Sequence, residues 1–169
     1  INRDLPQSRT FTFVWEKEKM TDLTALTGVY FEPTAINSAG DFCGINENQG
    51  SVVWTGEKLI EVGSLGGPSA RAWGINDAGQ VVGSSQDSDG KWKAFLWRKN
   101  VHSGQAKMVD LNRLIPARSG WELLEATSID ESGQIIGRGI YRGQERAFRL
   151  SPSNSGDQSR IEQTTAGVL

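Results

Sequence analysis

The strongest constraint on this chain is a short motif that occurs three times. Each copy begins with Ile followed by Asn or Asp, and it ends with two glycines that are separated by a variable residue and two apolar residues. The copies span residues 36–44, 75–83 and 129–137. A motif that recurs in this way is the signature of a repeat architecture. We therefore expect a residue present in every copy to serve the packing of the repeats first.

Two further motifs accompany the first, although the second of them has no copy after residues 129–137. One is an apolar segment that ends in Trp or, in the last copy, in Leu: residues 51–54, 94–97 and 147–150, with an earlier example at 11–15. The other is an apolar segment that contains an acid: residues 20–23, 59–62 and 108–111. Each full repeat therefore predicts four short strands. The first two are joined by a tight turn, in which Asn or Asp bonds its own backbone and Gly takes a positive φ.

The predicted fold class is all-β. The second and third strands of each repeat are apolar throughout, which is typical of strands covered on both faces by neighbouring sheets. Four-stranded antiparallel units of roughly 40–45 residues are the pattern of β-propeller blades. We therefore expect a propeller-like array.

The motifs resemble those of the HAF-repeat family, which is named for a His-Ala-Phe sequence. The resemblance is carried by Ala94-Phe95, Ala147-Phe148, Gly74–Gly83 and Leu65-Gly66-Gly67. It covers about residues 11–150, although Lys93 and Arg146 stand at the His position. The resemblance implies a propeller-like protein that is secreted or attached to the cell surface, and it brings no catalytic residues with it.

Two repeats are complete and two are partial. The expected boundaries are about 1–33, 34–71, 72–125 and 126–150, followed by a Ser/Gln/Thr-rich tail or linker at 151–169. Because a closed ring needs whole blades, we expect a piece of a longer array that supplies the remaining blades. A four-bladed ring patched by its own ends is the alternative. The chain starts with Ile1 and shows no signal peptide, so we expect a processed or cut N-terminus.

Composition excludes several partners. The net charge is −2 and both signs are interspersed, which does not suit nucleic acid. No apolar run approaches the length of a membrane span. The single histidine, His102, excludes the common zinc sites unless carboxylates dominate. Cys43 stands where Val82 and Ile136 stand in the other copies, so we expect a buried apolar side chain.

Two sets of repeated residues are of types that are also used in ligand binding and catalysis. Trp15, Trp54 and Trp97 share one position; we expect core packing between sheets, with a sugar-stacking platform as the alternative. The acids of the fourth strand also share one position: Asp22, Glu61 and Asp110. We expect them to accept structural hydrogen bonds, with metal binding or glycoside hydrolysis as the alternative.

The segment from Asp87 to Trp92 resembles the Asp-box of sialidase-type propellers, with its Gly and aromatic residue displaced by one. Asp87 and Asp89 are weak calcium candidates, because the remaining ligands of a calcium loop are missing. A plain Asp/Gly hairpin is the favoured interpretation.

The most variable connections point to a binding surface. In an antiparallel meander, the connections between the second and third strands emerge at the same end as the connections between repeats. They carry the candidate contacts Trp92, Arg118, Trp121, Tyr141 and Arg142. Ordinary loop variation, with Trp121 covering the end of a sheet, is the competing interpretation.

These observations favour a non-enzymatic extracellular scaffold that binds an unidentified protein or glycan. We assign it no catalytic residue, metal or cofactor. The alternative is a carbohydrate-active propeller enzyme, sialidase- or glycosidase-like, or a lectin-like module.

Overall fold

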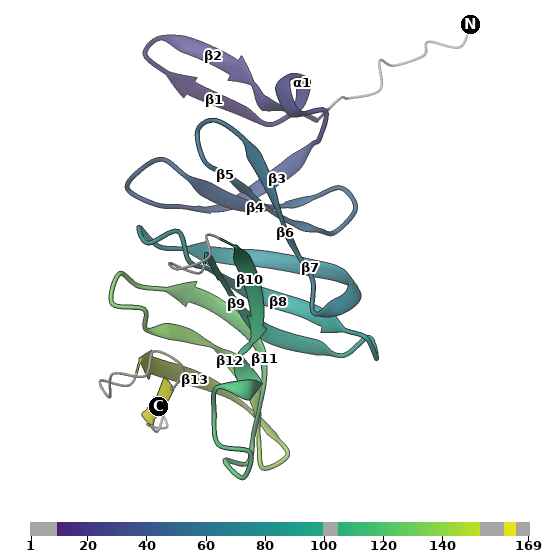
Figure 1. The fold of residues 1–169 in the computed structure, drawn as a ribbon, viewed down its shortest axis with the longest axis vertical. Helices are drawn as coiled ribbons and strands as arrows, with labels where there is room; N and C mark the ends of the chain where they lie inside the picture. The colour runs from purple at the N-terminus through teal and green to yellow at the C-terminus, as the bar shows by residue number, and fades with distance from the viewer. Residues whose placement is uncertain (1–9, 100–104, 153–160, 165–169) are drawn as a thin grey trace, which may run out of the picture.

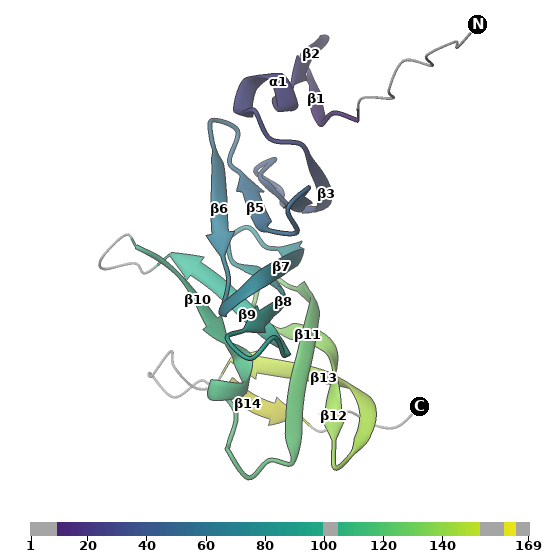
Figure 2. The same cartoon turned by 90° about the vertical axis from the view of Figure 1, so that its right-hand side faces the viewer.

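The protein is a stack of antiparallel sheets. The computed structural model describes residues 10–99, 105–152 and 161–164. Four sheets follow one another along the long axis of the molecule in chain order (Figures 1 and 2). The all-β fold with antiparallel sheets is confirmed.

Each sheet is formed by strands that are consecutive in the chain. The first sheet contains β1 (Phe13–Glu16) and β2 (Lys19–Asp22). The second contains β3 (Phe31–Ile36), β4 (Phe42–Asn46), β5 (Ser51–Trp54) and β6 (Leu59–Gly63). The third contains β7 (Gly66–Ile75), β8 (Val81–Asp87), β9 (Trp92–Lys99) and β10 (Ala106–Asp110). The fourth contains β11 (Trp121–Ile129), β12 (Ile135–Tyr141), β13 (Gln144–Pro152) and β14 (Ile161–Thr164). Two short helices, α1 (Leu23–Thr27) and η1 (Leu111–Arg113), follow β2 and β10.

The strand assignments of the second and third sheets match those expected from the motifs. The fourth sheet differs, because Ser151 and Pro152 belong to β13 and residues 161–164 form a fourth strand beside it. The segment 151–169 is therefore not wholly a tail. The second, third and fourth sheets also begin at residues 31, 66 and 121, a few residues before the corresponding repeat boundaries.

The predicted turns are confirmed. Gly40, Gly79 and Gly133 have φ angles of 85°, 67° and 80°. In the third sheet, the Asn76 side-chain oxygen accepts the Gln80 N–H at 3.0 Å, and the Gly79 N–H donates to the Asn76 carbonyl at 2.9 Å. The Asn therefore closes the hairpin and the Gly supplies the left-handed backbone, as the motif implies.

The same Asn residues also join neighbouring sheets, which was not expected. The Asn37 Nδ2 donates to the Asn76 carbonyl at 3.2 Å, and the Asn76 Nδ2 donates to the Asp130 carbonyl at 3.0 Å. Asp130 has no amide with which to continue the series. The three hairpin turns thus form a hydrogen-bonded ladder along one side of the stack.

The residue after each turn Asn or Asp adds a second row to this ladder. Backbone N–H groups of Ser38 and Asp77 donate to the carboxylates of Asp77 and Glu131, at 2.8 and 2.9 Å. The Ser38 hydroxyl also bonds to Asp77. The bonds from the Ser38 hydroxyl and N–H lower the pKa of the Asp77 carboxyl, because they favour its charged form.

Three apolar clusters fill the spaces between the four sheets. Trp54 and Trp97 are 6% and 3% exposed, so their predicted place in the core is confirmed. Each of them packs in the cluster on the side of the preceding sheet. The prediction is wrong for Trp15, which is 64% exposed. Trp15 belongs to the first sheet, and no described sheet precedes it.

Cys43 is fully buried in the cluster between the second and third sheets, as expected. The Thr34 hydroxyl lies 3.3 Å from its sulfur. Burial raises the pKa of the Cys43 thiol, because the charged thiolate would lose its hydration. Cys43 therefore serves packing.

The outer face of the fourth sheet carries a network of ion pairs beside the exposed Ile136. Arg138 forms ion pairs with Glu125 at 3.1 Å and with Glu145 at 3.2 Å. The hydrogen bond and charge of Glu125, followed by those of Glu145, raise the pKa of Arg138. Arg149 is exposed on the neighbouring strand.

Within the described residues, the first and fourth sheets lie at opposite ends of the stack (Figures 1 and 2). A ring closed by the chain's own ends is therefore not the arrangement of these residues. The connections between sheets and those between second and third strands lie together at one end of the strands, which we call the loop end. The ladder of turns lies at the opposite end, which we call the turn end.

Candidate functional site

Three of the five candidate contacts form one cluster at the loop end of the fourth sheet. Trp121 begins β11 and Tyr141 ends β12, and the two residues are paired across the strands. Their ring centroids are 5.0 Å apart, and the guanidinium carbon of Arg142 lies 5.1 Å from the Tyr141 ring. The strand register therefore produces an aromatic pair with a cation above it. We call these three residues the loop-end cluster.

The backbone holds the loop-end cluster in place. The Arg142 N–H donates to the Gly120 carbonyl at 3.0 Å. Arg142 itself has a positive φ of 49°, an uncommon conformation for a residue with a side chain. Its neighbour Gly143 also has a positive φ. Two residues thus turn the chain tightly and direct the Arg142 side chain back over Tyr141.

Trp121 also performs the structural role that the sequence left open. Its ring packs edge-on against the buried Phe148, with centroids 6.3 Å apart. It also lies against the apolar cluster between the third and fourth sheets. Trp121 is half-buried, so one part of the indole covers the sheet and another part remains at the surface.

Trp92 lies apart from the loop-end cluster, on the third sheet. The guanidinium carbon of Arg71 lies 4.9 Å from the Trp92 ring, and an Arg71 nitrogen contacts the Gln49 side-chain oxygen at 3.4 Å. This second cation–aromatic pair connects β7 and β9 with a loop of the second sheet. Arg71 and Gln49 were missed in the sequence, because neither belongs to a variable connection rich in aromatic residues.

Arg118 is exposed in the connection between β10 and β11. Among the described residues, no hydrogen bond, ion pair or ring contact joins it to the loop-end cluster. The structure therefore groups Trp121, Tyr141 and Arg142. It leaves Trp92 and Arg118 as separate features of the loop end.

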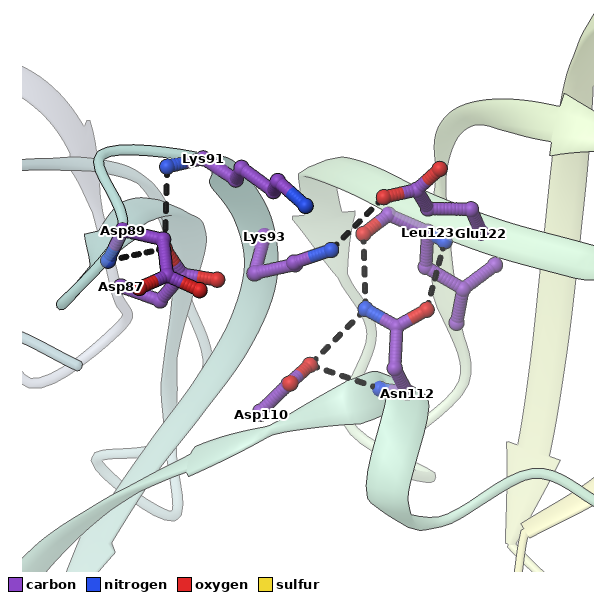
Figure 3. Close-up of polar contacts among 8 residues, drawn as sticks. All are labelled: Asp87, Asp89, Lys91, Lys93, Asp110, Asn112, Glu122 and Leu123. Carbon is purple, nitrogen blue, oxygen red and sulfur yellow. Dashed lines mark hydrogen bonds and ion pairs between the residues drawn. The ribbon is translucent and has the colours of Figure 1, made fainter. Parts of the chain in front are cut away.

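Hydrogen bonds anchor the long connection that leads to Trp121 (Figure 3). The Asn112 amide donates to the Leu123 carbonyl at 2.9 Å, and the Leu123 N–H donates to the Asn112 side-chain oxygen at 2.7 Å. The side chain of Asn112 thus pairs with β11 as a strand backbone would. It is oriented by Asp110, which accepts from the Asn112 amide at 2.8 Å.

An ion pair between Lys93 and Glu122 links the third and fourth sheets (Figure 3). The Lys93 Nζ lies 2.7 Å from a Glu122 carboxylate oxygen. The Lys93 side chain is mostly buried and the Glu122 side chain is half-exposed. Since Lys93 follows Trp92 and Glu122 follows Trp121, this bond fixes the relative position of the two strands. Sequence alone gave no signal for it, because the partners lie in different sheets, on strands β9 and β11.

Two of the three repeated acids act as helix N-caps. Asp22 accepts from the Ala25 N–H at 2.9 Å at the start of α1, and Asp110 accepts from the Asn112 N–H at 2.9 Å at the start of η1. Glu61 is exposed within β6, and among the described residues no hydrogen bond to its side chain gives it an equivalent role. The expectation of structural hydrogen bonding therefore holds for Asp22 and Asp110, but not for Glu61. In the described part of the chain, no three metal-ligating side chains come together.

Asp87 organises a hairpin loop (Figure 3). Its side-chain oxygen accepts from the N–H groups of Asp89 at 3.0 Å and Lys91 at 2.9 Å. Gly90 has a φ of 76°. The favoured interpretation of this segment as an Asp/Gly hairpin is confirmed. One of the two Asp87 carboxylate oxygens is thus engaged in the turn.

No protein family model matches the chain, and a search of curated proteins also finds no match. No helix among the described residues is long and apolar enough to cross a membrane. His102 lies outside the described residues.

Proposed function

We propose that the chain is a non-enzymatic binding scaffold that presents its loop end to a protein or glycan ligand. The observation that carries this proposal is the loop-end cluster, in which an aromatic pair and an arginine are held by paired strands and a hydrogen-bonded turn. Rigid aromatic residues and arginine are the side chains that contribute most to binding energy at interfaces. Their support by a regular sheet keeps the entropic cost of binding low.

The wider setting of the proposal is the resemblance to HAF repeats. The chain would then be a segment of a propeller-like array at the cell surface or outside the cell, with further blades supplied by a longer chain. The repetition of meandering four-stranded sheets supports this setting. So does the contrast between the uniform turn end, where side chains bond sheet to sheet, and the varied loop end.

The proposal is tested with the purified chain on a glycan array and on an array of extracellular protein domains. Replacing Arg142 by Gly removes the guanidinium group and suits the positive φ at this position. We expect Arg142→Gly to weaken binding. A matched control is Arg149→Ala, which removes an exposed arginine from the outer face of the fourth sheet.

Binding that survives Arg142→Gly and is lost in Arg149→Ala would overturn the assignment of the loop end. The absence of binding on both arrays, with the fold intact, would overturn the scaffold role itself.

The alternative, a carbohydrate-active enzyme, has a separate test. Asp22 and Asp110 already serve as helix caps, which favours a structural use of the repeated acids. We expect no turnover of a sialoside or of aryl glycosides above a buffer blank. Turnover that is abolished by Glu61→Gln would contradict the non-enzymatic proposal.

A further inference from the structure

Within the described residues, the first sheet has two strands, whereas each of the other sheets has four. By motif and by order, β1 and β2 are equivalent to the third and fourth strands of the other sheets. Among the described residues β1 pairs only with β2, so its other edge has no strand beside it. An open edge of this kind can pair with an added strand.

A groove lies beside this open edge. It has a volume of about 380 Å³ and is lined by Phe13 and Val14 of β1, residues 33–36 of β3, and Phe42 of β4. In the third and fourth sheets, the strands equivalent to β3 are covered: β7 packs against β3 and β4, and β11 packs against β7 and β8. The groove therefore occupies the place where the first two strands of the first sheet would lie.

The exposure of one isoleucine supports this comparison. Ile75 and Ile129 end the first strands of the third and fourth sheets, and they are 7% and 8% exposed. Both pack in clusters that include a residue from the second strand of the preceding sheet, Cys43 or Val82. Ile36 occupies the same position in the second sheet and is 67% exposed.

The ladder of turns has an unused acceptor at the same place. The carbonyls of Asn76 and Asp130 each accept from a Gly N–H in their own turn and from the Asn amide of the preceding turn. Among the described residues, the Asn37 carbonyl accepts only from the Gly40 N–H. A preceding turn with an Asn at this position could complete the series.

We propose that the groove between β1 and β3 is a docking site for a β-hairpin of the kind formed by the first two strands of this repeat. One strand of the hairpin pairs with the open edge of β1, its apolar face covers Ile36 and Phe42, and its turn Asn donates to the Asn37 carbonyl. The interface continues the two sheet-to-sheet interfaces already present in the chain. This inference rests on the proposed array of repeats, but it does not depend on a ligand at the loop end.

The probe is the chain's own hairpin, residues 70–85, which contains most of β7 and β8. An isolated hairpin is only marginally stable in water, so the segment is also fused ahead of residue 11 through a flexible linker. We expect the fusion to raise the thermal unfolding midpoint and to slow hydrogen exchange at residues 13–16. The free peptide should bind the unfused chain, with at least roughly tenfold weaker binding to Ile36→Asp.

Ile136→Asp is the matched control, because Ile136 is also exposed, at 49%, but lies on the fourth sheet. It should leave the effects of the peptide and of the fusion unchanged. An unchanged midpoint and unchanged exchange at residues 13–16 in the fusion would overturn the proposal. So would a dimer of the unfused chain that Ile36→Asp dissociates, because a second copy would then occupy the groove. None of these measurements involves the loop end, so the binding role proposed above succeeds or fails separately.

Discussion

The two glycines of the repeated motif have different physical roles, and Gly79 and Gly83 illustrate them. Gly79 has a φ of 67° and open space around the position of a Cβ atom. Gly83 has no such backbone requirement, but a Cβ atom there would lie 1.9 Å from the Arg71 carbonyl oxygen and 2.7 Å from the Phe95 ring. The first glycine is needed for conformation, and the second is needed for close strand approach.

These roles predict different costs of replacement by alanine. Gly79→Ala should lower the free energy of unfolding by about 1 kcal/mol, because Ala resists the left-handed conformation. Gly83→Ala should cost more, because strands β7 and β8 must separate or shift to admit the methyl group. Urea denaturation of both variants measures the difference. Equal costs would show that the two glycines share a single role.

The ladder at the turn end makes the stability of the protein depend on pH. The hydroxyl and N–H of Ser38 lower the pKa of Asp77 in the folded state. The bonds to the Asp77 carboxylate therefore stabilise the protein above the ordinary aspartate pKa of about 3.9 and are lost as pH falls through the lower folded-state pKa. Asp77→Ala should be less stable than the parent at neutral pH. The difference between the two should shrink as the pH falls through the folded-state pKa of Asp77.

Denaturant midpoints measured at several pH values test this prediction, with Asp89→Ala as a control. Asp89 is exposed in the hairpin at the other end of the strands. A gap between Asp77→Ala and the parent that stays constant down to about pH 2 would contradict the role of the Asp77 charge.

At the scale of the element, a residue contributes to stability according to its place in the repeat and to whether a neighbouring sheet covers it. Trp97 is buried between two sheets, and Trp15 occupies the equivalent position at an uncovered face. Trp97→Ala should cost roughly 3–5 kcal/mol, because it leaves a large cavity. Trp15→Ala should change stability by no more than about 0.5 kcal/mol. Urea denaturation distinguishes them, and a similar loss at both positions would show that Trp15 is covered in solution.

Much of the element order could be predicted from the sequence. The turn Asn and Gly residues act locally, so Gly79 and its equivalents identify the hairpins without knowledge of the fold. The exposure of Trp15 could not be predicted, because it depends on a neighbouring sheet and not on the residues around it. The strand at 161–164 was missed because no apolar residue follows its acid, Glu162, whereas an apolar residue follows the acid in each of the other fourth strands.

The candidate site was predictable only in part. The expectation that variable connections gather at one end holds, and strand pairing explains why Trp121 and Tyr141 meet. The contact of Arg71 with Trp92 and the ion pair of Lys93 with Glu122 depend on packing between strands that are distant in the sequence. The spacing of residues along the chain does not encode such contacts.

At the scale of the whole molecule, the stack has two chemically different ends. The first sheet exposes Trp15 and Met20, whereas the fourth sheet exposes the ion pairs of Arg138. Arg149 stands in the fourth sheet at the position where Val53 and Leu96 are buried in the second and third. The first sheet thus leaves large apolar side chains exposed, whereas the fourth sheet carries a network of ion pairs on its outer face beside the exposed Ile136.

The central claim is that the four sheets form an open stack with its first and fourth sheets far apart. The most direct test is the distance between spin labels at Lys19→Cys and Arg149→Cys, both at exposed positions. Cys43 is replaced by Val, the residue at the equivalent position 82, so that only these two sites react. Stacked sheets are about 10 Å apart, so three intervals predict a separation of roughly 30 Å by pulsed electron spin resonance. A sharp distribution below about 15 Å would place the two sheets side by side and contradict the open stack.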